Sequence, residues 1–222
     1  YCGLTTKNYN KVFLALLRNL KDEGVTVEGI HAYFDSLPGE STRWPSDNEF
    51  MVAWVSGHAY QLFQPARLAY VLRRLDEALT DRRAERMQLT ESLTIEHVLP
   101  QSWISHWPLP DGSTGLEGPG YHRASADDPR RIATDKRNAA VHRIGNLTLL
   151  SERLNPGVSN GPWEAKRRSI RRISKLAMNE QLTNSEMWNE EAINQRSMML
   201  FEIAKKIWPR TIPDRSLHVD HR

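Results

Sequence analysis

This 222-residue chain contains a single cysteine. Cys2 cannot form an internal disulfide or a cysteine-based zinc cluster within one chain, so the fold must depend on packing, and a reducing compartment suits it. Long hydrophobic runs are missing too, because no stretch approaches the roughly 20 apolar residues that cross a bilayer. The first residues lack the basic and apolar regions of a signal peptide. We therefore expect a cytoplasmic protein without a membrane segment.

A large excess of one charge is also absent. The net charge is +3 and the sequence pI is about 9.1, which is only mildly basic. These values do not by themselves indicate nucleic-acid binding, so the distribution of the charges matters more than their sum. The hydrophobic fraction of 39% is ordinary for a globular protein, and the length allows one or two domains.

Helical periodicity dominates the front of the chain. Val12, Leu16 and Leu20 recur at i, i+4 and i+8, and a further leucine stripe follows Pro65, which suits the first turn of a helix. We expect residues 1–90 to form a helical segment with a structural role.

Two short strands are predicted after this segment. The stretch LTIEHVL at 93–99 alternates as a strand does and ends at a proline, and GNLTLLS at 145–151 reads as a second strand. Residues 105–130 are rich in turn formers and predict a long loop, and 130–143 predict a basic helix. A further helix begins near Trp163, so the order is strand, loop, strand, helix.

The first strand carries Glu96 and His97 side by side between apolar runs. Burying either polar group costs free energy unless something pairs with it. On an ideal strand the two side chains project to opposite faces. Either a bend before Pro100 or a metal at the strand edge would bring both to one site, and the sequence leaves both open. Trp103 and Trp107 follow closely, and they either anchor the loop or stack on bases.

A family resemblance rests on four stretches: IEHVLPQSW, HRIGNLTLL, LNPGVSN and WEAK. The pieces EHVLP, GNLTLL and LNPGVSN resemble the ββα-metal module of HNH nucleases. The full set is similar to the C-terminal domain of GmrSD-type modification-dependent restriction endonucleases. The fold that this resemblance implies is mainly α, a helical domain with an embedded ββα-metal (HNH, His-Me finger) nuclease module. We expect that module over 91–180, with 181–222 as a C-terminal helix and tail packing on it.

The resemblance also implies the roles of individual residues. His97 would be the general base, and Glu96 and Asn155 would hold one divalent cation, Mg²⁺ or Mn²⁺, the ions that oxygen donors favour. Asn146, nine residues before Asn155, would orient the base and pin the two strands. Lys166 completes the catalytic set, and its position on the inward face of its helix points independently to a phosphate contact.

Further residues are candidates for nucleic-acid binding. Outward basic residues on the helix after Trp163 either grip the DNA backbone or form an ordinary solvated face. Asn160 either joins them or acts as a turn or capping residue. His142 and Arg143 either contact phosphate or are structural. The complete candidate set is Asn160, Lys166, Arg168, Arg171, Arg172, Lys175, His142 and Arg143.

The predicted function is therefore a metal-dependent DNA endonuclease or nickase domain of an anti-phage restriction protein. The alternatives are a non-catalytic nucleic-acid-binding module on the same scaffold, or an RNase. The expected partner is DNA, double-stranded and foreign or discriminated by modification. Because the chain lacks an initiator Met and any D-G-Q-Q-R-like motif, we expect an N-terminal ParB-like nucleotide-hydrolysing domain outside this sequence.

Overall fold

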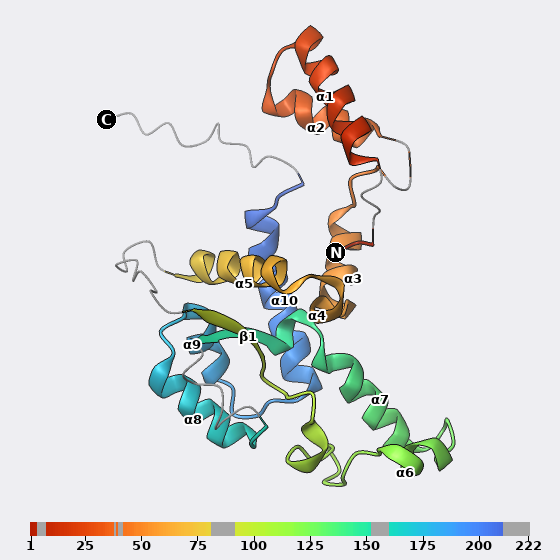
Figure 1. The fold of residues 1–222 in the computed structure, drawn as a ribbon, viewed down its shortest axis with the longest axis vertical. Helices are drawn as coiled ribbons and strands as arrows, with labels where there is room; N and C mark the ends of the chain where they lie inside the picture. Colours follow the sequence, from red (N-terminus) through yellow and green to blue (C-terminus); the bar gives the residue numbers. More distant parts are fainter. Residues whose placement is uncertain (4–7, 38, 40–41, 81–91, 152–159, 211–222) are drawn as a thin grey trace.

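The computed structural model describes residues 1–3, 8–37, 39, 42–80, 92–151 and 160–210 (Figure 1). The described part is mainly helical, which confirms the predicted class. The only sheet in the described residues has two strands. None of its helices is long and apolar enough to cross a membrane. In chain order the elements are α1 (Tyr9–Glu23), α2 (Val27–Ser36), α3 (Asp47–Ser56), α4 (Ala59–Leu62), α5 (Pro65–Leu79), β1 (Leu93–His97), η1 (Trp103–Ser105), α6 (Gly118–Arg123), α7 (Pro129–Val141), η2 (Ile144–Asn146), β2 (Leu147–Ser151), α8 (Trp163–Ile173), α9 (Ala177–Thr183) and α10 (Glu190–Ile207).

Strands β1 and β2 pair antiparallel, with Leu93 opposite Ser151 and His97 opposite Leu147. Both strands lie within the predicted ranges but are two residues shorter, at the end of β1 and at the start of β2. The strands end here because Leu99 donates its backbone N–H to the Asn146 side chain instead of to a strand partner. The hydrogen-bond ladder between β1 and β2 therefore ends where the Asn146 side chain binds the backbone of Leu99.

The connection between the strands holds more helix than the sequence predicted. Residues 105–130 include the end of η1 and all of α6, and α7 occupies most of the predicted basic helix. The start of α7 follows capping rules, since Asp128 accepts hydrogen bonds from the backbone N–H groups of Arg130 and Arg131, and Pro129 fills the first helical position. His142 is the C-cap of α7, and its side chain lies next to His97 at the end of β1.

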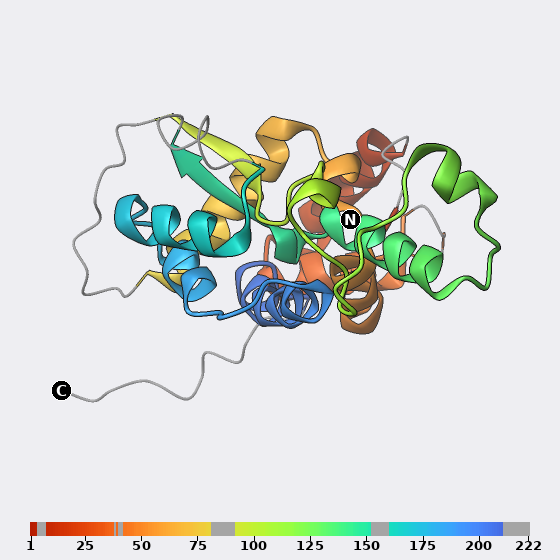
Figure 2. The same cartoon turned by 90° about the horizontal axis from the view of Figure 1, so that it is seen from below.

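Helix α10 lies at the centre of the fold. It packs against α3 and α5 on the N-terminal side, and against η2 and α7 beside the strands. Figure 2 shows its lower end between α8 and α9 on one side and α7 on the other. One apolar cluster joins Trp54 of α3 and Leu72 of α5 to Leu149 of β2, and a second joins Leu99 to Ile170 of α8 and Ile193 of α10.

Helices α1 and α2 form a pair at one end of the molecule, away from the strands (Figure 1). They pack on each other, and Tyr33 donates a hydrogen bond to the carbonyl of Val12. The strands have α5, α8 and α9 as helical neighbours, and they lie away from α1 and α2.

Candidate functional site

Glu96 and Lys166 meet at the end of β1. The ammonium of Lys166, on α8, lies 2.8 Å from Oε1 of Glu96 and donates to the backbone carbonyl of His97 at 2.6 Å. Lys166 is fully buried, and the Glu96 side chain is 12% exposed. Burial lowers the pKa of Lys166, and the Glu96 carboxylate opposes that shift. The inward lysine predicted from the sequence therefore faces a carboxylate and a carbonyl from β1.

His97 points to different neighbours from those of Glu96. Its Nε2 lies 3.3 Å from Nδ1 of His142, and its Nδ1 lies 3.4 Å from the amide nitrogen of Gln101. The ring of Tyr60 packs edge-on against it at 4.4 Å between centroids. Desolvation, with smaller contributions from His142 and Lys166, lowers the pKa of His97 to about 4. The imidazole is therefore neutral at neutral pH and has a lone pair that can accept a proton.

The adjacency of these two residues now has a physical reason. Each polar side chain leaves the strand on its own side and finds its own partner, Lys166 for Glu96 and His142 for His97. Both partners lie far along the chain, at the end of α7 and on α8. The two contacts give each polar side chain a hydrogen-bonding partner. These contacts account for the burial of both polar side chains.

Asn146 ties the end of β1 to the start of β2. Its side chain is fully buried and accepts from Leu99 N–H at 2.8 Å, while its amide donates to the carbonyls of Leu99 at 2.9 Å and Val141 at 2.7 Å. The indole N–H of Trp188 donates to the same side-chain oxygen at 3.0 Å. The amide therefore fixes the chain directly after His97. Trp188 was not anticipated from the sequence, because no local pattern places it beside the strands.

The glycine before Asn146 lies against α10. A Cβ atom at Gly145 would lie 2.1 Å from the carbonyl oxygen of Ile193 and 2.4 Å from Oγ of Ser197. Its N–H donates to that Oγ at 3.1 Å, and Arg196 donates to its carbonyl at 2.7 Å. Gly145 thus allows close contact with α10, and Asn146 binds the backbone just after β1.

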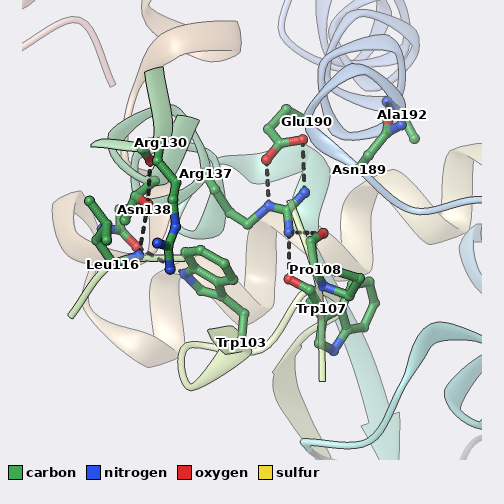
Figure 3. Close-up of polar contacts among 11 residues, drawn as sticks. Trp103, Trp107, Pro108, Leu116, Arg130, Arg137, Asn138, Asn189, Glu190 and Ala192 are labelled. Carbon is green, nitrogen blue, oxygen red and sulfur yellow. Dashed lines mark hydrogen bonds and ion pairs between the residues drawn. The ribbon is translucent and has the colours of Figure 1, made fainter. Parts of the chain in front are cut away.

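Both tryptophans after β1 serve as anchors. Trp103 is 1% exposed and donates to Asn138, and Trp107 is 5% exposed and donates to the carbonyl of Gly161. Buried indoles of this kind cannot stack on bases without rearrangement, so the anchoring alternative describes them. Arg137 completes the anchor by binding Glu190 and the carbonyls of Trp107 and Pro108, with its guanidinium over the Trp103 ring (Figure 3).

The predicted basic residues lie on the surface. Arg168, Arg171 and Arg172 are exposed on α8, whereas Lys175 is exposed beyond the end of the helix at Ile173. Arg168 donates to the carbonyl of Glu164, and Arg171 donates to the carbonyl of Thr183. Asn160 is also exposed, but α8 has Pro162 at its N-cap without a side-chain cap, so Asn160 does not cap this helix. Arg143 is half-buried beside His142.

The proposed metal ligands are described only in part. Asn155 lies outside the residues that the structure describes. Within the described ranges no group of three or more His, Cys, Asp or Glu side chains could hold a metal ion. Glu96 supplies a hard oxygen donor, and the hydrogen bond from Lys166 engages one of its two oxygens. The carboxylate thus fits one ligand of an oxygen-coordinated cation, with Lys166 beside it.

Comparison with known proteins identifies a family. A family model described as the C-terminal domain of GmrSD restriction endonucleases matches residues 44–203, which is more than half of the chain. The matched range contains α3 to β2, α8 and α9, and most of α10, and leaves out α1 and α2. No curated protein and no solved structure matches.

Proposed function

The chain belongs to the GmrSD restriction endonuclease C-terminal domain family, and from this premise we propose that it is a metal-dependent DNA endonuclease or nickase domain of a modification-dependent restriction protein. Family membership supports a nuclease-related function with DNA as substrate. One observation carries the finer proposal: a buried, neutral His97 directly follows a carboxylate at the end of β1. An HNH-type ββα-metal module needs a carboxylate and a histidine at the end of its first strand. In this proposal β1, β2 and α8 form that module.

His97 is the general base of the proposed reaction. Its neutral ring takes a proton from a water molecule while the water oxygen forms a bond to phosphorus. The bond from phosphorus to the 3′ oxygen breaks, and that oxygen leaves and takes a proton from solvent. The products carry 5′-phosphate and 3′-hydroxyl ends. No covalent intermediate with the protein is needed.

The proposed cofactor is Mg²⁺ or Mn²⁺, held by Glu96 and Asn155. When bound, the cation would polarise the scissile phosphate and offset the charge that develops on the departing oxygen. Glu96 suits this task because its second carboxylate oxygen makes no hydrogen bond to any described residue. Lys166 holds the carboxylate in place from the other side at 2.8 Å.

Other residues bind and position the substrate in this proposal. Asn146 holds the backbone after His97, and the fully buried Lys166 positions Glu96. The exposed basic side chains of α8 contact the DNA backbone without reading sequence. Asn160 and Arg143 are further proposed contacts. A ParB-like domain outside this sequence would recognise the DNA modification and hydrolyse nucleotide.

Plasmid nicking tests the proposal. Purified protein is incubated with supercoiled DNA and, in parallel, with RNA, in Mg²⁺ or Mn²⁺ and in a chelator. We expect metal-dependent nicking of DNA, and a loss of about 10² to 10⁴-fold in rate for His97→Ala, the range that a general base contributes. The matched control is His106→Ala, an exposed histidine of the loop after η1. Equal nicking by His97→Ala would refute the assignment, and cleavage of RNA alone would make the domain an RNase.

A second candidate follows from the ion pair itself. Because Lys166 already neutralises Glu96 inside the protein, the same scaffold could serve as a nucleic-acid-binding module without turnover. Salt-dependent binding of DNA, with no cleavage in either metal, favours this candidate.

A further inference from the structure

His97 touches two side chains that can exchange hydrogen bonds with its ring. Gln101, an exposed residue, approaches Nδ1, and His142 approaches Nε2. The contacting atom of Gln101 is the amide nitrogen, which can only donate. Nδ1 of His97 must then accept, and in a neutral imidazole the proton lies on the other nitrogen. Nε2–H of His97 therefore donates to Nδ1 of His142.

Tyr60 and the end of α7 fix the ring of His142. His142 caps α7, and its carbonyl accepts from the backbone N–H of Tyr60 at 3.2 Å. The Tyr60 ring stacks on the His142 ring, with 5.9 Å between centroids and an angle of 19° between the planes. The same Tyr60 ring packs edge-on against His97. One tyrosine of α4 thus holds both imidazoles in register.

We propose that His142 is a positioning residue for the base: it accepts a hydrogen bond from Nε2–H of His97, holds that tautomer, and leaves Nδ1 as the nitrogen that takes the proton from water. The catalytic part of this inference rests on the proposed function, whereas the hydrogen-bond part does not. The exposed amide of Gln101 occupies the position at Nδ1 that the attacking water would take. Gln101 therefore marks the side from which substrate approaches His97.

The chemistry of the pair explains why a second histidine serves here. The orienting partner of a catalytic imidazole must accept a hydrogen bond and keep its geometry, and a neutral imidazole does both. A partner of this kind sets which ring nitrogen carries the proton without adding a formal charge. His142 would then act through His97 and would not touch the reacting atoms.

Two-bond proton–nitrogen NMR spectra of the full chain test the hydrogen bond directly. The ring signals of His97 are assigned by their loss in His97→Ala. We expect the proton on Nε2 in the wild type and in His142→Asn, because the asparagine oxygen can replace Nδ1 of His142 as the acceptor. In His142→Leu we expect a mixture of the two tautomers. A proton on Nδ1 in the wild type, or an unchanged tautomer in His142→Leu, would overturn the proposal.

Single-turnover cleavage gives the second readout. We expect His142→Leu to lower the rate about 10- to 100-fold, a part of what the base contributes, with little change in DNA affinity. His142→Asn should recover most of the rate, and the control His106→Leu should match the wild type. Equal loss in His142→Leu and His142→Asn would contradict a hydrogen-bonding role. If the wild type cleaves nothing, the proposed function fails, while the NMR spectra still decide whether His142 orients His97.

Discussion

Lys166 and Glu96 form a buried ion pair across 70 positions of sequence, with 2.8 Å between Nζ and Oε1. The same ammonium binds the carbonyl of His97, so α8 is fixed to the end of β1 through two oxygens of adjacent residues. A buried pair of this kind adds little to stability compared with an apolar pair, but loss of one partner leaves a charge without compensation. The pair therefore couples the stability of the fold to the geometry of the candidate site.

The first prediction concerns this pair. Lys166→Met should lower the free energy of unfolding by about 3 kcal/mol, because the Glu96 charge remains buried without its partner. For a chain of this length that corresponds to a fall in Tm of roughly 6 to 12 °C. Circular dichroism at pH 7 measures it.

A double variant gives the internal control. Adding Glu96→Gln to Lys166→Met removes the uncompensated charge, so it should recover part of the lost stability. Arg168→Met, an exposed change on the same helix, should stay within about 0.5 kcal/mol of the wild type. A Tm for Lys166→Met that equals that of Arg168→Met would show that the ion pair has no such role.

The second prediction concerns the contact between η2 and α10. Gly145→Ala should destabilise the protein by about 3 kcal/mol or prevent folding, because its Cβ would meet the backbone carbonyl of Ile193 at 2.1 Å. Backbone atoms cannot move aside as a flexible side chain can. Gly120→Ala is the matched control, since no atom lies within 4 Å of a Cβ there. If chemical denaturation gives both variants the same midpoint, close packing at Gly145 does not limit stability.

Much of the fold could be predicted from hydrophobic periodicity and from residues such as proline that begin or end helices and strands. The leucine stripe after Pro65 became α5, with Leu68 and Leu72 fully buried, and the alternation around Ile95 became β1. These features are local, so a short window of sequence contains them. The strand ends could not be predicted, because the side chain of Asn146 stops the ladder, and that contact joins residues 47 positions apart.

The candidate site likewise combines residues that local sequence patterns predict with residues that only distant contacts bring together. The motifs pointed to Glu96, His97 and Lys166, but the contact between His97 and His142 depends on where α7 ends. Neither Gln101 nor Tyr60 was anticipated. Gln101 follows His97 by four residues outside any helix, and Tyr60 reaches the site from α4, so no helical or strand periodicity connects them to it.

The third prediction concerns pH. Burial lowers the pKa of His97 from 6.5 to about 4, so between these values the unfolded chain binds a proton that the folded protein does not. The free energy of unfolding therefore decreases as the pH falls from about 6.5 to 4. Above pH 6.5 the stabilisation that comes from a neutral His97 is fully present. The difference between the two pKa values corresponds to about 3 kcal/mol in the free energy of unfolding. Urea unfolding at several pH values measures it.

The comparison protein for this experiment is His97→Gln. It lacks the titrating ring, so its stability should fall less steeply over the same window, while all carboxylates titrate alike in the two proteins. The difference between the two curves isolates His97. Parallel curves from pH 6.5 to 4 would mean that the pKa of His97 is the same in the folded and unfolded states.

The fourth prediction concerns Arg172, near the end of α8, and Lys175, just after that helix, which are exposed and make no hydrogen bond or ion pair to any described residue. They are therefore better placed to neutralise phosphates than Arg168 and Arg171, whose guanidinium groups donate to backbone carbonyls.

Each phosphate contact adds about 0.9 to the slope of log K against log salt for duplex DNA, so Arg172→Ala with Lys175→Ala should reduce the slope by up to about 1.8. Fluorescence anisotropy with a labelled duplex in a chelator measures binding without cleavage. The matched control removes the same two charges from α1, by Arg18→Ala with Lys21→Ala, in a helix outside the family match. A slope that changes equally in both double variants would mean that only net charge attracts DNA, and a slope that changes in neither would place the DNA on another face.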